Sequence, residues 1–285
     1  MMGKWKNGIL DGPGFFINMD INKLKVGPVL KRVTKVNFIF FIIILNLSGI
    51  LDLGHFDKVA LGFFLVYILV TREWLLLHCA VIFFLWSLSD LLSYLELLRL
   101  PALGLIILFV VSTLLILPFR QTRAALSWIK FGKIDRVTIF LLIVIGLISS
   151  GALIVWALWT DNLGLGLQMV EDVAHYPKPL ILLLGIPLFA LINALAEEII
   201  YRGILHEALT HTFSNGYLAI VLQATAFAAI HFAVGFPNGL WGYLMVLCYG
   251  VMLGYLKKRT SGILSPYLSH IVADLTIGYY LVCKA

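Results

Sequence analysis

Six consecutive residues place three charges inside an apolar part of the chain: Glu197-Glu198-Ile199-Ile200-Tyr201-Arg202. The run before them, residues 179–196, carries no charge at all. An ionisable group at membrane depth is costly unless it is paired or faces a polar cavity, so it indicates a functional site. Two further apolar segments carry one histidine each, His231 and His270. Glutamates and histidines on separate membrane helices are the groups that a buried hydrolytic site, a metal site or a proton relay needs.

The helical spacing of the acidic motif separates two roles for its carboxylates. Glu198 and Arg202 are four residues apart with the glutamate first, which is the favourable order for an ion pair within a helix. Glu197 lies about 100° around the helix from Glu198. We therefore predict that Glu197 has no partner in its own helix and is free to act as a general base. The alternative is an ordinary helix end at the cytoplasmic interface, where long charged side chains reach water.

Each histidine has a possible partner one helical turn away. Phe227 precedes His231 by four residues and can pack on its imidazole. Asp274 follows His270 by four residues and can orient that ring and fix its tautomer. Taken alone, a membrane histidine is more often a hydrogen-bonding group between helices than a ligand. The histidine–aspartate pair can likewise be a local hydrogen bond with no catalytic role.

The composition indicates the class of protein. Of the 285 residues, 61% are hydrophobic and only 13% are charged, whereas a soluble domain has about 25% charged residues. Helices satisfy their own backbone hydrogen bonds in lipid, so we predict an all-α, polytopic membrane helix bundle. The net charge of +6 comes from basic residues in short loops, which are orientation signals and do not indicate a nucleic-acid partner.

Apolar runs predict eight or nine transmembrane helices, since a span needs about 20 mostly apolar residues. The second and third runs are short and form either two spans or one bent span with an interfacial piece. Residues 1–35 are a basic cytosolic tail, and residues 36–160 contain the N-terminal transmembrane helices. The predicted spans are residues 36–53, 59–71, 74–89, 101–119, 137–160, 179–201, 216–235, 239–256 and 261–282.

Three basic clusters predict the orientation. Positive residues collect on the cytoplasmic side of membrane proteins, and nine spans with a cytosolic N-terminus put all three clusters there. We therefore expect a multi-pass protein, in a plasma membrane, with its N-terminus in the cytosol. The clusters are Lys31, Arg32 and Lys35; Arg120, Arg123, Lys130, Lys133 and Arg136; and Lys257, Lys258 and Arg259.

The predicted spans raise a geometric conflict. A span that ends at residue 201 puts Glu197 near the inner face of the membrane, whereas His231 falls near the outer face. The two side chains meet only if the boundaries shift by about two turns, or if residues 203–214 dip into the protein and raise Glu197.

Taken together, the three motifs resemble those of the CPBP family, which comprises CAAX prenyl endopeptidases and Abi-type bacteriocin-immunity proteins. Residues 197–202 resemble its EExxxR motif, and residues 227–231 resemble its FxxxH motif. His270 and Asp274 resemble its third motif, a histidine followed four residues later by Asn or Asp, although Asn is the commoner residue there. The resemblance covers residue 179 to the C-terminus, so residues 179–285 are expected to be a CPBP-like catalytic transmembrane core.

The resemblance implies an intramembrane endopeptidase that hydrolyses a peptide bond of a membrane-associated or prenylated peptide, or of a membrane-anchored protein, in the lipid bilayer. Glu197 would activate a water with help from His231, while His270 and Asp274 would steady the oxyanion. An ionised aspartate cannot donate a hydrogen bond to an oxyanion, so Asp274 either acts when protonated or orients His270 instead. The implied catalytic residues, of which the second and third hold the site, are Glu197, Glu198, Arg202, His231, His270 and Asp274.

Several alternatives to this mechanism and function stay open. An older view of the family assigns the residues matching Glu197, His231 and His270 to a metal, and such a set can bind zinc. We expect no cofactor, because the chain has no HExxH motif. A proton-coupled transporter also uses Glu and His chains, but it usually has two related halves, and here one half holds all the motifs. A catalytically inactive immunity or scaffold protein is the third possibility.

Overall fold

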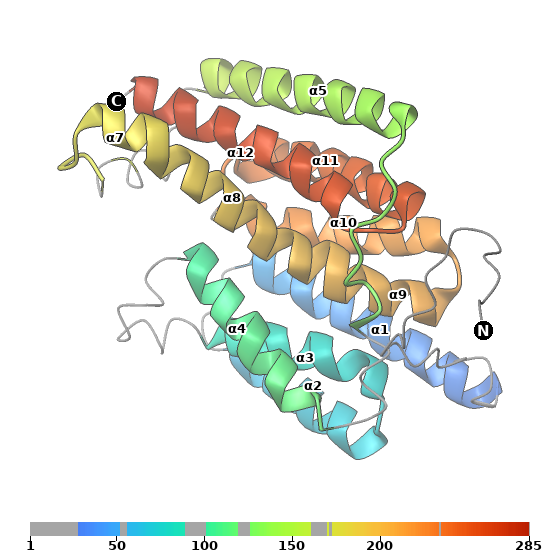
Figure 1. Cartoon of the computed structure of the whole chain (residues 1–285). Helices are drawn as coiled ribbons and strands as arrows, with labels where there is room; N and C mark the ends of the chain where they lie inside the picture. Colours follow the sequence, from blue (N-terminus) through green and yellow to red (C-terminus); the bar gives the residue numbers. More distant parts are fainter. Residues whose placement is uncertain are drawn as a thin grey trace, which may run out of the picture.

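The computed structural model describes residues 28–51, 56–88, 101–118, 126–160, 170, 173–233 and 235–284, and for 28–34, 57, 75 and 101–103 it describes the backbone alone. Within these residues every regular element is a helix (Figure 1). The chain is therefore a helical membrane bundle, as its composition predicts. Residues 1–27 of the predicted cytosolic tail lie outside the described part.

The N-terminal helices form one side of the bundle. They are α1 (Pro28–Ile50), α2 (Phe56–Thr71), α3 (Trp74–Ser87) and α4 (Pro101–Ile116). The helix α1 begins at Pro28, within the predicted tail, and its apolar part begins at Lys35. Proline is favoured in the first turn of a helix, where its missing N–H costs nothing. The short second and third runs form two separate helices that pack against each other.

Four of the described helices are long and apolar enough to cross a membrane: Arg136–Thr160, Lys178–Phe213, Gly216–Ala233 and Gly239–Thr260. Parts of α1 to α4 are shorter apolar helices of 10–17 residues. The last helix, α12 (Leu264–Lys284), is long but contains several polar residues, among them Ser269, His270 and Asp274.

One long helical stretch carries the acidic motif. It runs through α7 (Lys178–Leu180), the π-helical η4 (Ile181–Gly185), α8 (Ile186–Glu197), the π-helical η5 (Glu198–Leu205) and α9 (His206–Phe213), 36 residues in all. The predicted end at residue 201 is wrong, because residues 203–213 stay helical and bury His206, Ala208 and Leu209. At about 1.5 Å per residue, Glu197 therefore lies near the middle of the stretch.

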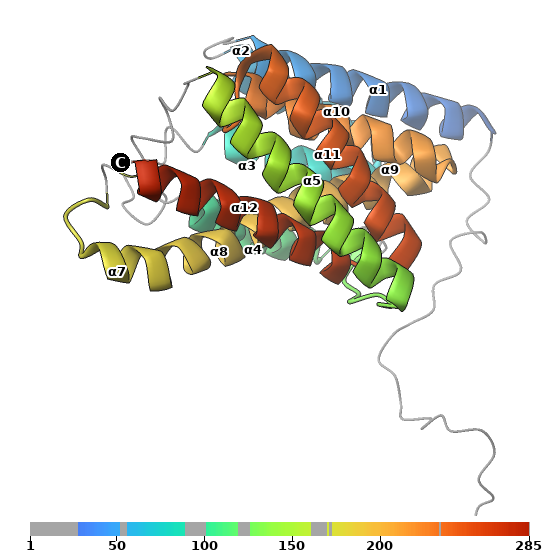
Figure 2. The same ribbon diagram turned by 90° about the horizontal axis from the view of Figure 1, so that it is seen from above.

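The helices that follow enclose this stretch. They are α5 (Arg136–Thr160), α10 (Gly216–Ala233), α11 (Gly239–Thr260) and α12. In both views α12 lies beside α8, and α5 covers the outer side of α12 (Figures 1 and 2). The N-terminal half joins this core mainly through α1 and α10. A side chain at Gly49 would come within 2.6 Å of the Ala229 backbone, so only glycine permits this approach of the two helices.

Basic residues gather at one end of the bundle. The loop before α5 pairs with the turn between α11 and α12, where the Lys133 N–H donates to the Thr260 carbonyl at 3.0 Å. In the same region Arg259 contacts Asp135 at 2.8 Å. The backbone N–H of Thr138, then its hydroxyl and then Arg259 lower the pKa of the exposed Asp135 carboxyl to about 2. The start of α1 lies at this end too (Figures 1 and 2).

Candidate active site

A fully buried ion pair lies at the start of η5. Arg202 Nη1 is 2.9 Å from Glu198 Oε1, and both side chains are 0% exposed. This is the pair that the four-residue spacing predicts. The guanidinium also stacks on the ring of Phe227 from α10, with its carbon 4.3 Å from the ring centroid. Short π-helical segments occur frequently at functional sites, where they change the direction of side chains along a helix.

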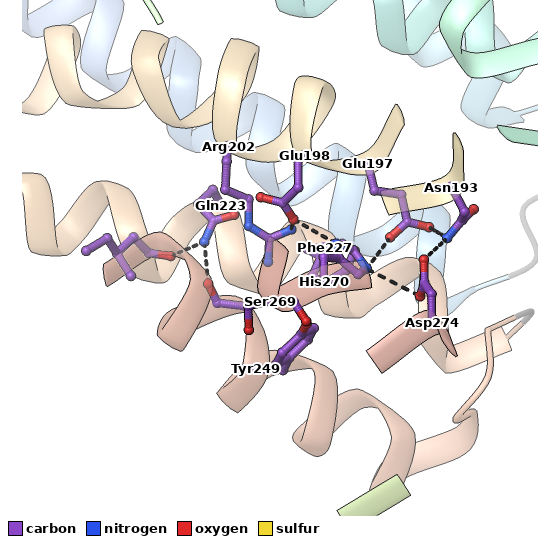
Figure 3. Close-up of polar contacts among 12 residues, drawn as sticks. Asn193, Glu197, Glu198, Arg202, Gln223, Phe227, Tyr249, Ser269, His270 and Asp274 are labelled. Atoms are coloured by element: carbon purple, nitrogen blue, oxygen red, sulfur yellow. Dashed lines mark hydrogen bonds and ion pairs between the residues drawn. The ribbon is translucent and has the colours of Figure 1, made fainter. Parts of the chain in front are cut away.

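His270 of α12 lies between the two glutamates of the motif. Its Nδ1 is 2.8 Å from Glu198 Oε1, and its Nε2 is 3.5 Å from Glu197 Oε2 (Figure 3). Two aromatic rings enclose the imidazole edge-on: Phe227 at 5.9 Å and Tyr249 at 5.7 Å between ring centroids. The ring is therefore fixed in orientation, with one nitrogen on the ion pair and the other toward Glu197.

Asp274 also faces His270, but at a longer distance. Its Oδ1 is 3.7 Å from Nε2, on the same side of the ring as Glu197. Glu198, on the other side, makes the short contact. The structure therefore gives Glu198 the closer hold on the imidazole, whereas the sequence suggested Asp274 for that task.

Glu197 differs from its neighbour in exposure and in partner. Its side chain keeps 13% exposure, whereas that of Glu198 has none. The prediction that Glu197 has no partner in its own helix is wrong. The amide Nδ2 of Asn193, one turn earlier, donates to Glu197 Oε1 at 3.3 Å and to Asp274 Oδ2 at 3.1 Å. Of the two carboxylates of the motif, only that of Glu197 keeps some exposed surface.

His231 lies next to the other site residues, with the Phe227 ring between its imidazole and that of His270. Its Nδ1 is 3.1 Å from the Phe227 carbonyl, and the two rings are 5.0 Å apart, so Phe227 packs on the imidazole as predicted. Because the same Phe227 ring also contacts His270 and Arg202, it joins the second motif to the other two. The long helical stretch explains this meeting, since it places Glu197 at mid-helix and brings residues 203–213 into the protein.

Sequence spacing missed two residues of the site. Asn193 is a polar side chain in an otherwise apolar run and stands four residues before Glu197, which is a signal that spacing could have used. Tyr249 of α11 donates from its hydroxyl to the Ser269 carbonyl at 3.1 Å, next to His270. No spacing rule connects α11 to α12 in this way, so Tyr249 had no signal in the sequence.

The predicted alternative ligand set for zinc does not fit this geometry. Among the described residues, no three His, Cys, Asp or Glu side chains are placed to hold a metal ion together. His270 is engaged by Glu198 at Nδ1, and the contacts of the His231 ring are with Phe227. A metal-free site stays a prediction.

Part of the chain is similar to a known protein family. Residues 179–276 match the family model described as Type II CAAX prenyl endopeptidase Rce1-like. The match supports a CPBP/CAAX protease family for this region. The match begins one residue after the start of the long helical stretch Lys178–Phe213. All six predicted site residues lie inside the match. No curated protein and no solved structure matches the chain.

Proposed function

We propose that this chain is an intramembrane endopeptidase in which Glu197 activates the attacking water. The observation that carries this proposal is the contrast between the two neighbouring glutamates. Glu198 is sealed in an ion pair with Arg202, whereas Glu197 is partly open and faces His270. The two environments separate the roles of the carboxylates, and the accessible one can act as a general base.

In this mechanism Glu197 takes a proton from a water molecule while the oxygen of that water attacks the scissile carbonyl carbon. The same carboxyl group then gives the proton to the leaving amine, so that the base is regenerated. Removal of a general base typically costs about 10²–10⁴-fold in rate. Substitution of Glu197 is thus expected to lower the cleavage rate more than substitution of any other residue of the site.

His270 is the expected oxyanion donor. With the Nδ1 proton donated to Glu198, the ring presents Nε2 toward Glu197 and Asp274. A protonated ring donates Nε2–H to the negative oxygen of the tetrahedral intermediate, and a buried, preoriented donor of this kind stabilises the transition state strongly. Glu198 and Arg202 hold the imidazole in place, while His231 adds a polar group behind Phe227.

The basic end of the bundle supports a cytosolic N-terminus. The described parts of the basic loop before α5 and of the α11–α12 turn lie together there, with the start of α1 at the same end. Because positive loops face the cytosol, we propose that this end is cytosolic and that the C-terminus is outside, in a plasma membrane. The substrate is a peptide or protein anchored in the bilayer. The description of the matching family suggests that this anchor is a prenyl group.

The test is hydrolysis of a lipid-anchored peptide by the purified protein in nanodiscs, with the products identified by mass spectrometry. A farnesylated peptide and the same peptide without the lipid are compared, since only the first tests a prenyl requirement. We expect one defined cleavage by the wild type and none by Glu197→Gln.

The matched control is Glu207→Gln. This glutamate lies on the same helical stretch but is bonded to Lys257 and Ser127, away from the site. Compared at equal amounts of folded protein, it should keep wild-type cleavage. A wild-type protein that cleaves no anchored peptide, or equal cleavage by Glu197→Gln, would contradict the proposal.

A further inference from the structure

One side-chain amide lies between two carboxylates of the site. Asn193 Nδ2 is 3.3 Å from Glu197 Oε1 and 3.1 Å from Asp274 Oδ2 (Figure 3). A primary amide nitrogen carries two hydrogens and can therefore donate to both oxygens at once. Two acidic groups from different helices thus share one donor, next to the imidazole that each of them also faces.

The electrostatics of the site explain what this amide does. Three carboxylates, from Glu197, Glu198 and Asp274, surround His270 in a largely buried volume. Arg202 forms its ion pair with Glu198, so the carboxylates of Glu197 and Asp274 have no guanidinium partner among the described residues of the site. A donor to a carboxylate favours its ionised form, and a carboxylate must be ionised to take a proton from water.

Other contacts also hold η4 and α8 against α12. The Tyr267 hydroxyl donates to the Leu191 carbonyl of α8 at 3.1 Å, and the Tyr279 hydroxyl donates to the Leu182 carbonyl of η4 at 3.1 Å. Gly278 also lies so near Ile186 that an added Cβ would come within 2.6 Å of its side chain. The contribution of Asn193 is therefore local to the two carboxylates.

We infer that Asn193 is a positioning residue for the reaction: its amide fixes Glu197 Oε1 and Asp274 Oδ2 and so holds Glu197 ionised and aimed beside His270. This inference rests on the proposed peptidase function. Asn193 acts through Glu197, so its loss lowers the rate of the chemical step and leaves substrate binding nearly unchanged.

The test uses Asn193→Leu, which removes the donor at similar volume, and Asn193→Asp, which replaces the donor by an acceptor. Both should lower kcat on the order of 10–100-fold, the effect of losing a hydrogen bond to a charged group, with little change in KM. The matched control is Asn46→Leu, since Asn46 is another intramembrane asparagine and bonds to Ile42 and Thr225 outside the site. It should keep the wild-type kcat.

A second measurement needs no activity. Dicyclohexylcarbodiimide labels protonated carboxyl groups in apolar surroundings, and mass spectrometry reports the rate at Glu197. Labelling should be faster in both Asn193 variants than in the wild type and in Asn46→Leu. Unchanged labelling together with unchanged kcat would overturn the role of Asn193, even if Glu197→Gln abolishes cleavage. A wild type that cleaves nothing would contradict the proposed function, and the labelling rates alone would then decide whether Asn193 holds Glu197 ionised.

Discussion

Removal of Arg202 tests whether Glu198 is the structural carboxylate of the motif, held in a buried ion pair. Arg202→Ala leaves Glu198 as a carboxylate with no exposure to solvent and without its guanidinium partner. Breaking a buried ion pair in this way costs about 3–5 kcal/mol of unfolding free energy. His270 Nδ1 remains 2.8 Å from the same carboxylate oxygen and compensates in part, so we expect the lower end of that range.

The expected loss is large enough to measure in detergent. At about 2–4 °C per kcal/mol for a chain of 150–250 residues, a loss of about 3 kcal/mol lowers the melting temperature by roughly 6–12 °C. Circular dichroism or a thiol-reactive dye assay on purified protein reports this change. Peptide cleavage should fall as well, because Glu198 no longer holds the His270 ring in a fixed position.

Arg259→Ala is the matched control. Arg259 contacts Asp135 at 2.8 Å, a separation as short as that of the buried pair, but the side chains are 29% and 60% exposed. Water and salt screen such a pair, so its removal should leave the melting temperature nearly unchanged. Equal shifts in the two variants would refute the reasoning, because burial would then make no difference between the pairs.

With the native cysteines removed, Cys at position 133 should resist a membrane-impermeant reagent in intact cells and Cys at position 175 should react; the reverse pattern would invert the proposed topology. Exhaustive chelation should leave peptide cleavage at its full rate, with no zinc found by elemental analysis, whereas stoichiometric zinc lost together with activity would contradict a metal-free site. Gly203→Ala should lower the unfolding free energy by about 1–3 kcal/mol, because the new Cβ would lie 2.8 Å from Cδ2 of the buried Trp128 ring; an unchanged melting temperature would show that the ring moves aside.

Much of the fold could be predicted from the sequence, because apolar length is what a bilayer requires. The predicted runs 59–71, 101–119, 137–160 and 216–235 correspond closely to α2, α4, α5 and α10. The predictions failed where charged or polar residues continue a helix. Residues 203–213 resemble an interfacial segment by composition, yet Lys257 satisfies Glu207 at 2.8 Å from a helix distant in sequence. Such a partner cannot be seen in local hydropathy.

The candidate site divides in the same way into local and tertiary features. The Glu198–Arg202 pair follows from helical spacing alone and was predicted. The 2.8 Å contact of Glu198 with His270 joins residues that are 72 positions apart, so no periodicity contains it. Asn193 lies between these cases, since its spacing to Glu197 was readable but its second bond, to Asp274, depends on the packing of α8 on α12.

The central claim is that Glu197 is the general base of a peptidase, and one ratio tests it most directly. The measurement is kcat for hydrolysis of the anchored peptide by the wild type divided by kcat for Glu197→Gln, with both proteins shown to be folded by their melting temperatures. We predict a ratio on the order of 10²–10⁴, as for the loss of a general base. A ratio near one in a folded Glu197→Gln protein would contradict the account.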